Sequence, residues 1–153
     1  MKRDIVVEVV YPHPPERVWQ ALTEPRAIGA WLMENDFSPL VGYKFQFRTK
    51  PQPGFNGIVD CKVLEVDPPR RLSYSWQGGS MSHSTVVTYI LDPVPGGTRL
   101  RLEHRGFRGF KDVAISFFLS SGWKRHILRN SLPALLDRMA AGEFAANERR
   151  AEP

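Results

Sequence analysis

Hydrophobic and polar residues alternate through much of the chain, which is the pattern of β-strands with one buried face. The clearest case is the stretch 43–48, where Tyr, Phe and Phe alternate with Lys, Gln and Arg. The same period, or a run of Val and Ile, predicts further strands at residues 4–11, 58–66, 72–76, 87–92 and 98–106. Short turns rich in proline and glycine join the last five strands, so one six-stranded antiparallel sheet is expected. A change of hydrophobic phase between Val63 and Leu64 indicates a β-bulge.

The hydrophobic spacing becomes helical in three places. Two short helices are expected after the first strand, at about 15–22 and 26–31, with prolines at the start of the first. A long helix is expected from Gly122 to about Ala141, and Pro133 should kink it near Arg129. Residues 107–121 are expected to be a connection with some helical character. The long helix carries a hydrophobic stripe of Leu128, Leu132, Leu135 and Met139.

These elements predict an α+β fold in which the sheet curves around the long C-terminal helix. An antiparallel sheet with one hydrophobic face must be covered, and only this helix has enough hydrophobic surface to do so. Residues 1–141 are expected to form a single domain, since no linker or repeat interrupts them. Residues 142–153 lack a hydrophobic stripe and are expected to form a frayed tail.

The composition indicates the cellular compartment and the kinds of partner that are expected. No hydrophobic run approaches the roughly 20 residues of a membrane span, and the N-terminus leads into a strand pattern. The single cysteine, Cys61, cannot form an internal disulfide, which fits a reducing, cytoplasmic compartment. The net charge of +5 permits weak attraction to anions, but a solvated charged surface is the simpler explanation.

A run of basic residues follows the outer face of the last predicted strand. It lacks interleaved exposed aromatic residues and a recognition helix, so nucleic acid is not expected as a partner. The simpler interpretation is a charged outer face that keeps the sheet soluble. The run consists of Arg99, Arg101, Arg105, Arg108 and Lys111.

The order of strand, two short helices, five strands and long helix resembles the helix-grip fold of the START and birch-pollen-allergen superfamily (SRPBCC). Several motifs narrow this resemblance: residues 15–23, Trp31, residues 63–76, residues 96–100, Glu103-His104 and Gly122-Trp123. With these motifs the chain resembles bacterial homologues of the C-terminal domain of the heat-shock-protein ATPase activator. This resemblance implies a cavity between helix and sheet that takes varied apolar small molecules, and, in one branch, activation of a chaperone.

Established catalytic and metal-binding patterns do not occur in the sequence. The four histidines lie on separate elements without a Cys or His at ligand spacing, so no metal site is expected. No nucleophile elbow and no glycine-rich phosphate loop is present, so neither a catalytic triad nor a nucleotide cofactor is expected. His104 shares the hydrophobic parity of Leu100 and Leu102, which makes it the one weak catalytic candidate. The alternative for His104 is a structural histidine with satisfied hydrogen bonds.

Residues of hydrophobic parity, together with the first half of the long helix, form the candidate ligand site. They either line a cavity or fill a solid core, and the sequence leaves both open. The candidate ligand-binding residues are Phe45, Phe47, Tyr74, Trp76, Tyr89, His104, Trp123, Ile127, Asn130 and Ser131.

The leading hypothesis is therefore a binding module for a hydrophobic or aromatic small molecule, without cofactor. One alternative is a cyclase- or hydrolase-like enzyme that uses His104 in the same cavity. Another is a protein that regulates a chaperone ATPase, which rests on the resemblance alone. The sequence does not indicate an oligomeric state.

Overall fold

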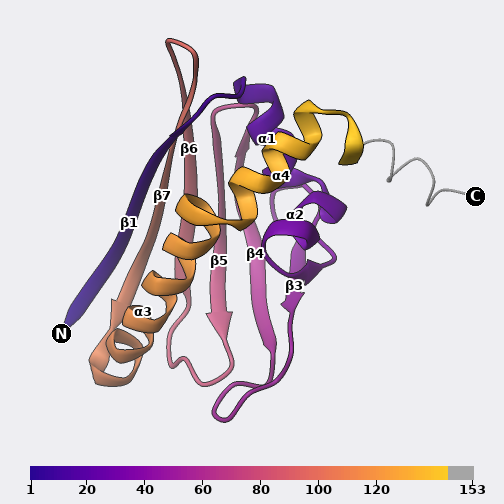
Figure 1. Cartoon of the computed structure of the whole chain (residues 1–153). Coiled ribbons are helices and arrows are strands. Elements are labelled where there is room, and N and C mark those ends of the chain that lie inside the picture. The colour runs from indigo at the N-terminus through magenta and orange to yellow at the C-terminus, as the bar shows by residue number, and fades with distance from the viewer. Residues whose placement is uncertain (145–153) are drawn as a thin grey trace, which may run out of the picture.

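One antiparallel sheet of seven strands forms the centre of the computed structural model, which describes residues 1–144. The first strand lies at one edge of the sheet and pairs with the last, and the order across the sheet is β1-β7-β6-β5-β4-β3-β2 (Figure 1). The strands are β1 (Lys2–Tyr11), β2 (Glu34–Asn35), β3 (Lys44–Arg48), β4 (Ile58–Asp67), β5 (Arg71–Gly78), β6 (Thr85–Val94) and β7 (Gly97–Arg108).

The prediction of six strands missed β2. This strand pairs only Glu34 and Asn35 with β3, and two residues are too few to show a period in the sequence. The predicted bulge in β4 is confirmed, because the register against β5 shifts between Val63 and Glu65. The α+β class, the antiparallel pairing and the positions of the six longer strands agree with the prediction.

Two short helices follow β1, as predicted: α1 (Pro15–Thr23) and α2 (Pro25–Trp31). Each begins with a proline, whose missing N–H costs nothing in the first turn of a helix. The buried Trp31 joins them, since its indole N–H donates a 2.8 Å hydrogen bond to the carbonyl of Ala21.

The C-terminal helical segment begins earlier than predicted. It consists of α3 (Gly109–Lys124), a π-helical turn η1 (Arg125–Arg129) and α4 (Ser131–Ala140), and it crosses one face of the sheet diagonally (Figure 1). A start at Gly122 was therefore wrong. Hydrophobic residues occur on all sides of α3, so its sequence lacks the one-sided period that marks an amphipathic helix.

The predicted kink near Arg129 is confirmed. The backbone leaves the helical region at Asn130, with φ −123° and ψ −60°. Pro133 has no N–H to offer the carbonyl of Arg129, four residues earlier, so a regular helix cannot continue through this point. The π turn also shifts the phase of the stripe, and Leu128, which was expected inside, is 41% exposed.

The core lies between the sheet and the helices and extends almost to the end of the described chain. Phe144 is buried in it, while most of the predicted tail, residues 145–153, lies outside the described range. No helix within residues 1–144 is long and apolar enough to cross a membrane.

Candidate functional site

Eight of the ten candidate ligand residues are buried in the core on the helical side of the sheet. Neighbouring rings are in close contact: the centroids of Phe45 and Tyr74 are 5.2 Å apart, and those of Trp76 and Trp123 5.4 Å. The eight, called the aromatic cluster below, are Phe45, Phe47, Tyr74, Trp76, Tyr89, His104, Trp123 and Ile127. The strands and the helix thus bring together residues that are up to 82 positions apart in the sequence (45 to 127).

Asn130 and Ser131 do not join the aromatic cluster. Asn130 is exposed at the helix break, and Ser131 is half-buried with its hydroxyl 3.0 Å from Nδ1 of His126. Because the π turn rotates the chain after Ile127, these two polar residues do not face the sheet as a continuous helix would have placed them.

His104 is fully buried, and both of its ring nitrogens are hydrogen-bonded. Nδ1 accepts a 3.0 Å bond from the indole N–H of Trp123, so Nε2 carries the hydrogen. Nε2 donates over 2.7 Å to the hydroxyl of Thr85, which donates to the carbonyl of Trp76 over 2.8 Å. Burial lowers the pKa of His104 to about 3, so the ring is neutral at physiological pH. These contacts favour the structural interpretation of His104 over a general base.

Thr85 was not among the candidates, although the sequence held a signal for it. It shares the parity of Val87 and Tyr89 along β6, so it points to the same buried side of the sheet. A threonine at such a position needs a polar partner, and His104 on the neighbouring strand provides it.

The hydroxyls of Tyr74 and Tyr89 lie 2.6 Å apart inside the aromatic cluster. Each hydroxyl carries one hydrogen, and the bond between them uses only one of the two. The described residues offer the second hydrogen no further hydrogen-bond acceptor. Burial raises the pKa of both tyrosines, so both stay protonated. The interior therefore contains one unused hydrogen-bond donor among aromatic rings.

The hollows at the surface of the described structure include two that border strand ends. One, of about 380 Å³, lies at the end of the sheet away from the aromatic cluster and is lined by Pro12, His13, Pro14, Pro15, Gly96 and Gly97. The other, of about 480 Å³, borders the aromatic cluster only at Phe45 and is lined by Asp36, Lys44, Phe45, Gln46, Asp60 and Cys61. At the centre of the aromatic cluster, which neither hollow reaches, neighbouring rings are in contact.

A buried carboxylate, which the sequence did not single out, ties the β5–β6 loop to α3. Asp112 accepts backbone N–H bonds from Ser82 (2.8 Å) and His83 (2.9 Å), and its carboxylate lies 3.0 Å from Nδ1 of His83. Burial alone would raise the pKa of Asp112, but these hydrogen bonds outweigh it and hold the pKa below its usual value. Within residues 1–144, no three His, Cys, Asp or Glu side chains are grouped to bind a metal ion.

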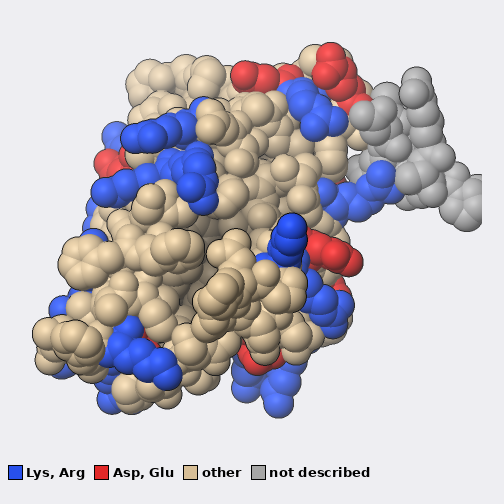
Figure 2. All heavy atoms as spheres, turned by 60° about the horizontal axis from the view of Figure 1, so that its bottom comes forward, with Lys and Arg blue, Asp and Glu red and all other residues tan. Residues whose placement is uncertain are grey.

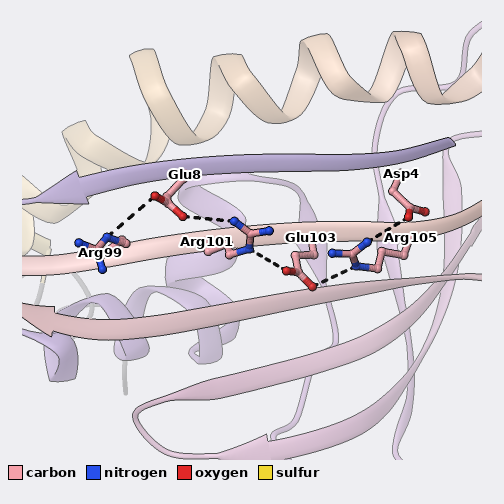
Figure 3. A network of polar contacts seen from close by, with 6 residues as sticks. All are labelled: Asp4, Glu8, Arg99, Arg101, Glu103 and Arg105. Carbon is pink, nitrogen blue, oxygen red and sulfur yellow. Dashed lines mark hydrogen bonds and ion pairs between the residues drawn. The ribbon is translucent and has the colours of Figure 1, made fainter.

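The basic run on β7 is largely paired with acidic residues. Arg101 lies between Glu8 (3.4 Å) and Glu103 (2.7 Å), as Figure 3 shows. Arg105 bridges Glu103 (3.1 Å) and Asp4 (3.0 Å), and Arg99 lies 3.9 Å from Glu8. This part of the outer sheet surface is a mixed-charge network, in keeping with the solvated face expected from the sequence.

The sequence and the fold are similar to those of known proteins. Residues 12–137 match the family model of "Activator of Hsp90 ATPase homolog 1-like protein", which is well over half of the chain. The chain belongs to this family. The resemblance inferred from the turn and aromatic motifs, and the helix-grip fold that it implied, are thereby confirmed. None of the curated proteins matches the chain.

Solved structures agree with the family and the fold. Protein MLL2253 from Mesorhizobium loti is 40% identical, with 89% of this chain and 98% of that chain covered and a TM-score of 0.77. The Aha1 dimer from Colwellia psychrerythraea is 20% identical, with 84% and 99% covered and a TM-score of 0.61. CalU16 from Micromonospora echinospora is 23% identical, with 94% and 87% covered and a TM-score of 0.62. At these lower identities the last two show a shared fold only.

Proposed function

We propose that the protein binds an apolar, aromatic small molecule that carries a hydrogen-bond acceptor, between the sheet and α3–η1. The observation that carries the proposal is the unused hydroxyl hydrogen of the Tyr74–Tyr89 pair. A buried donor without an acceptor costs free energy. A ligand carbonyl that accepted this hydrogen would recover that free energy. The surrounding rings offer the apolar lining that is typical of ligand pockets.

A ligand can enter only if a space opens between the sheet and α3, and bending of the helical segment at η1 would open one. Trp123 closes the aromatic cluster from the helical side, next to the π turn and the break at Asn130. α4 packs on α1 and α2, whereas α3 contacts mainly β1 and β7, so the two helices rest on different parts of the fold. Bending at η1 would lift Trp123 from Trp76 and Tyr89 without disturbing α4.

Two matched probes test this proposal: 1-tetralone, an aromatic ketone, and tetralin, the same ring system without the carbonyl. Isothermal titration is expected to show 1-tetralone binding roughly fivefold more tightly, because only the ketone accepts the spare hydroxyl hydrogen. The double variant Tyr74→Phe/Tyr89→Phe should bind both probes equally. Tyr43→Phe, which changes a tyrosine outside the aromatic cluster, should keep the preference. If neither probe binds the wild-type protein, the proposal fails.

A second candidate function, regulation of a chaperone ATPase, is favoured by the family match. It predicts that the purified protein changes the ATP turnover of an Hsp90-type chaperone at micromolar concentration. An unchanged turnover rate, together with no detectable complex, would exclude it. The enzymatic alternative has less support, because burial lowers the pKa of His104 to about 3 and so makes its ring a weak proton acceptor.

A further inference from the structure

The outward side of α3 is unusually apolar. Phe110, Phe117 and Phe118 are 80%, 62% and 75% exposed, and Ala114 and Ser121 between them are exposed too. At about 100° per residue these five positions fall within an arc of about 100° on the helix. The opposite side of α3 is the buried one, with Asp112, Ser116 and Trp123 among its members. α3 therefore buries one side and presents a second, phenylalanine-rich stripe outward.

The charged side chains that flank this stripe are all basic. Lys111 and Lys124 are exposed at its two margins, and Arg3 from β1 stacks 3.9 Å from the ring centre of Phe117. Further exposed cations follow at Arg108, Arg125 and Arg129. In contrast with the network of Figure 3, none of these six cations forms an ion pair with a described residue.

Acidic residues are absent from the whole surface of this segment. Between residues 105 and 136, the only acidic residue is Asp112, and it is buried against the β5–β6 loop. The left half of Figure 2, where α3 lies, shows a wide uncharged surface with Lys and Arg beside it and very little Asp or Glu. The stripe with its cationic margins is called the α3 face below.

We propose that the α3 face docks on the surface of an anionic lipid bilayer. A helix that carries aromatic residues on one side and Lys or Arg at the margins can lie in the plane of the bilayer interface. The phenyl rings would then enter the boundary between headgroups and acyl chains, and the lysines would extend toward the lipid phosphates. This inference goes beyond ligand binding and does not depend on it.

Two other occupants fit the α3 face less well. A second copy related by a two-fold axis would bring the cations of both copies together, and their repulsion opposes that contact. An acidic protein would match the charge, but the three phenyl rings project from a convex helix and would need preformed cavities in the partner. A fluid bilayer accepts projecting rings without such cavities.

Co-sedimentation with vesicles tests the proposal on the full chain. We expect binding to phosphatidylcholine vesicles that contain phosphatidylglycerol, and much weaker binding to pure phosphatidylcholine or at high salt. Phe110→Ser/Phe118→Ser should weaken binding at least roughly tenfold, because two buried rings are lost. Lys111→Gln should weaken it roughly fivefold. The matched control is Leu40→Ser/Val41→Ser, which removes two exposed apolar side chains from the β2–β3 loop and should leave vesicle binding unchanged.

Three results would overturn the proposal. The first is no binding to the anionic vesicles at low salt, and the second is binding that the phenylalanine variant leaves unchanged. The third is that the vesicles stay unbound while Phe110 and Phe118 are needed for another interaction. Binding to polyglutamate would then assign the α3 face to an acidic protein, and self-association in light scattering would assign it to a second copy. Each variant is expected to keep the fold, because all the substituted side chains are exposed. Circular dichroism of each variant checks this.

Discussion

The indole N–H of Trp123 donates a 3.0 Å hydrogen bond to Nδ1 of His104, inside the core and across 19 residues of sequence. This contact joins α3 to β7 and determines the tautomer of the histidine. Because Nδ1 accepts, Nε2 must donate, and Thr85 completes the chain of bonds. The polar network thus specifies how the helical segment is seated on the sheet.

Replacing Trp123 with Phe tests this contact. The variant keeps an aromatic ring but leaves Nδ1 of the buried His104 without a donor. We expect the free energy of unfolding to fall by about 2–4 kcal/mol, from the unpaired nitrogen and the smaller ring together. Denaturant titration measures it. As the control, Trp19→Phe changes an indole that is only partly buried, and a loss as large as that of Trp123→Phe would show that ring size alone is responsible.

His104 predicts a pH dependence of stability. Its pKa is about 3 in the folded protein against 6.5 for an ordinary histidine, so below pH 6.5 the unfolded chain binds a proton that the folded protein does not. His104 therefore does not lower the free energy of unfolding above pH 6.5. As the pH falls from 6.5 toward 3, it lowers the free energy of unfolding by about 1.4 kcal/mol per pH unit. Unfolding measured over this pH range should show a shallower slope for His104→Asn. Parallel slopes would mean that His104 does not carry the dependence.

The buried Tyr11 of β1 is hydrogen-bonded to the π turn that precedes the helix break. The hydroxyl of Tyr11 donates a 2.6 Å bond to the carbonyl of Ile127 in the π turn, where regular helical partners are lost. Tyr11→Phe should lower the free energy of unfolding by about 1–3 kcal/mol, because the buried carbonyl loses its donor. Thermal or denaturant unfolding is the measurement. Tyr43→Phe, at a partly exposed position, should stay within about 0.5 kcal/mol of wild type.

The arginine network on β1 and β7 should contribute little to stability. Glu103 accepts bonds from Arg105 and Arg101, which hold its pKa below the usual value, but the two arginine side chains are 48% and 38% exposed, so solvent screens the pairs. Glu103→Gln is expected to change the free energy of unfolding by less than about 1 kcal/mol, and added salt should reduce the effect further. A loss above about 2 kcal/mol would show that the network acts as a unit.

Strand parity predicted most of the fold because the inward faces of β3, β5, β6 and β7 are strongly hydrophobic. The same parity correctly placed Trp76 and His104 in the interior. It could not indicate whether the rings leave a space between them, because this depends on side-chain contacts. α3 escaped detection for a physical reason as well: its outer side carries Phe110, Phe117 and Phe118, so no polar side revealed the helical period.

Burial of the candidate site residues was predicted correctly on the strands and wrongly after the helix break. Inward positions recur at every second residue in a strand, so the inward orientation of Tyr74 and Tyr89 could be predicted from the hydrophobic residues two positions away. Asn130 and Ser131 were assigned to the site because they lie in the half of the predicted helix before Pro133, but after the π turn at Arg125–Arg129 they lie outside the aromatic cluster. A proline indicates that a helix will kink, but it does not give the direction of the kink.

The binding proposal is tested most directly by the indole N–H signals of the four tryptophans in a nitrogen-labelled sample, recorded by NMR during titration with 1-tetralone. Trp76 and Trp123 lie in the aromatic cluster, whereas Trp31 is bonded to Ala21 between α1 and α2. If the ligand enters between the sheet and α3–η1, the signals of Trp76 and Trp123 shift with saturation, and those of Trp19 and Trp31 stay in place. Shifts confined to Trp19 and Trp31, or no shift at any tryptophan, would contradict it.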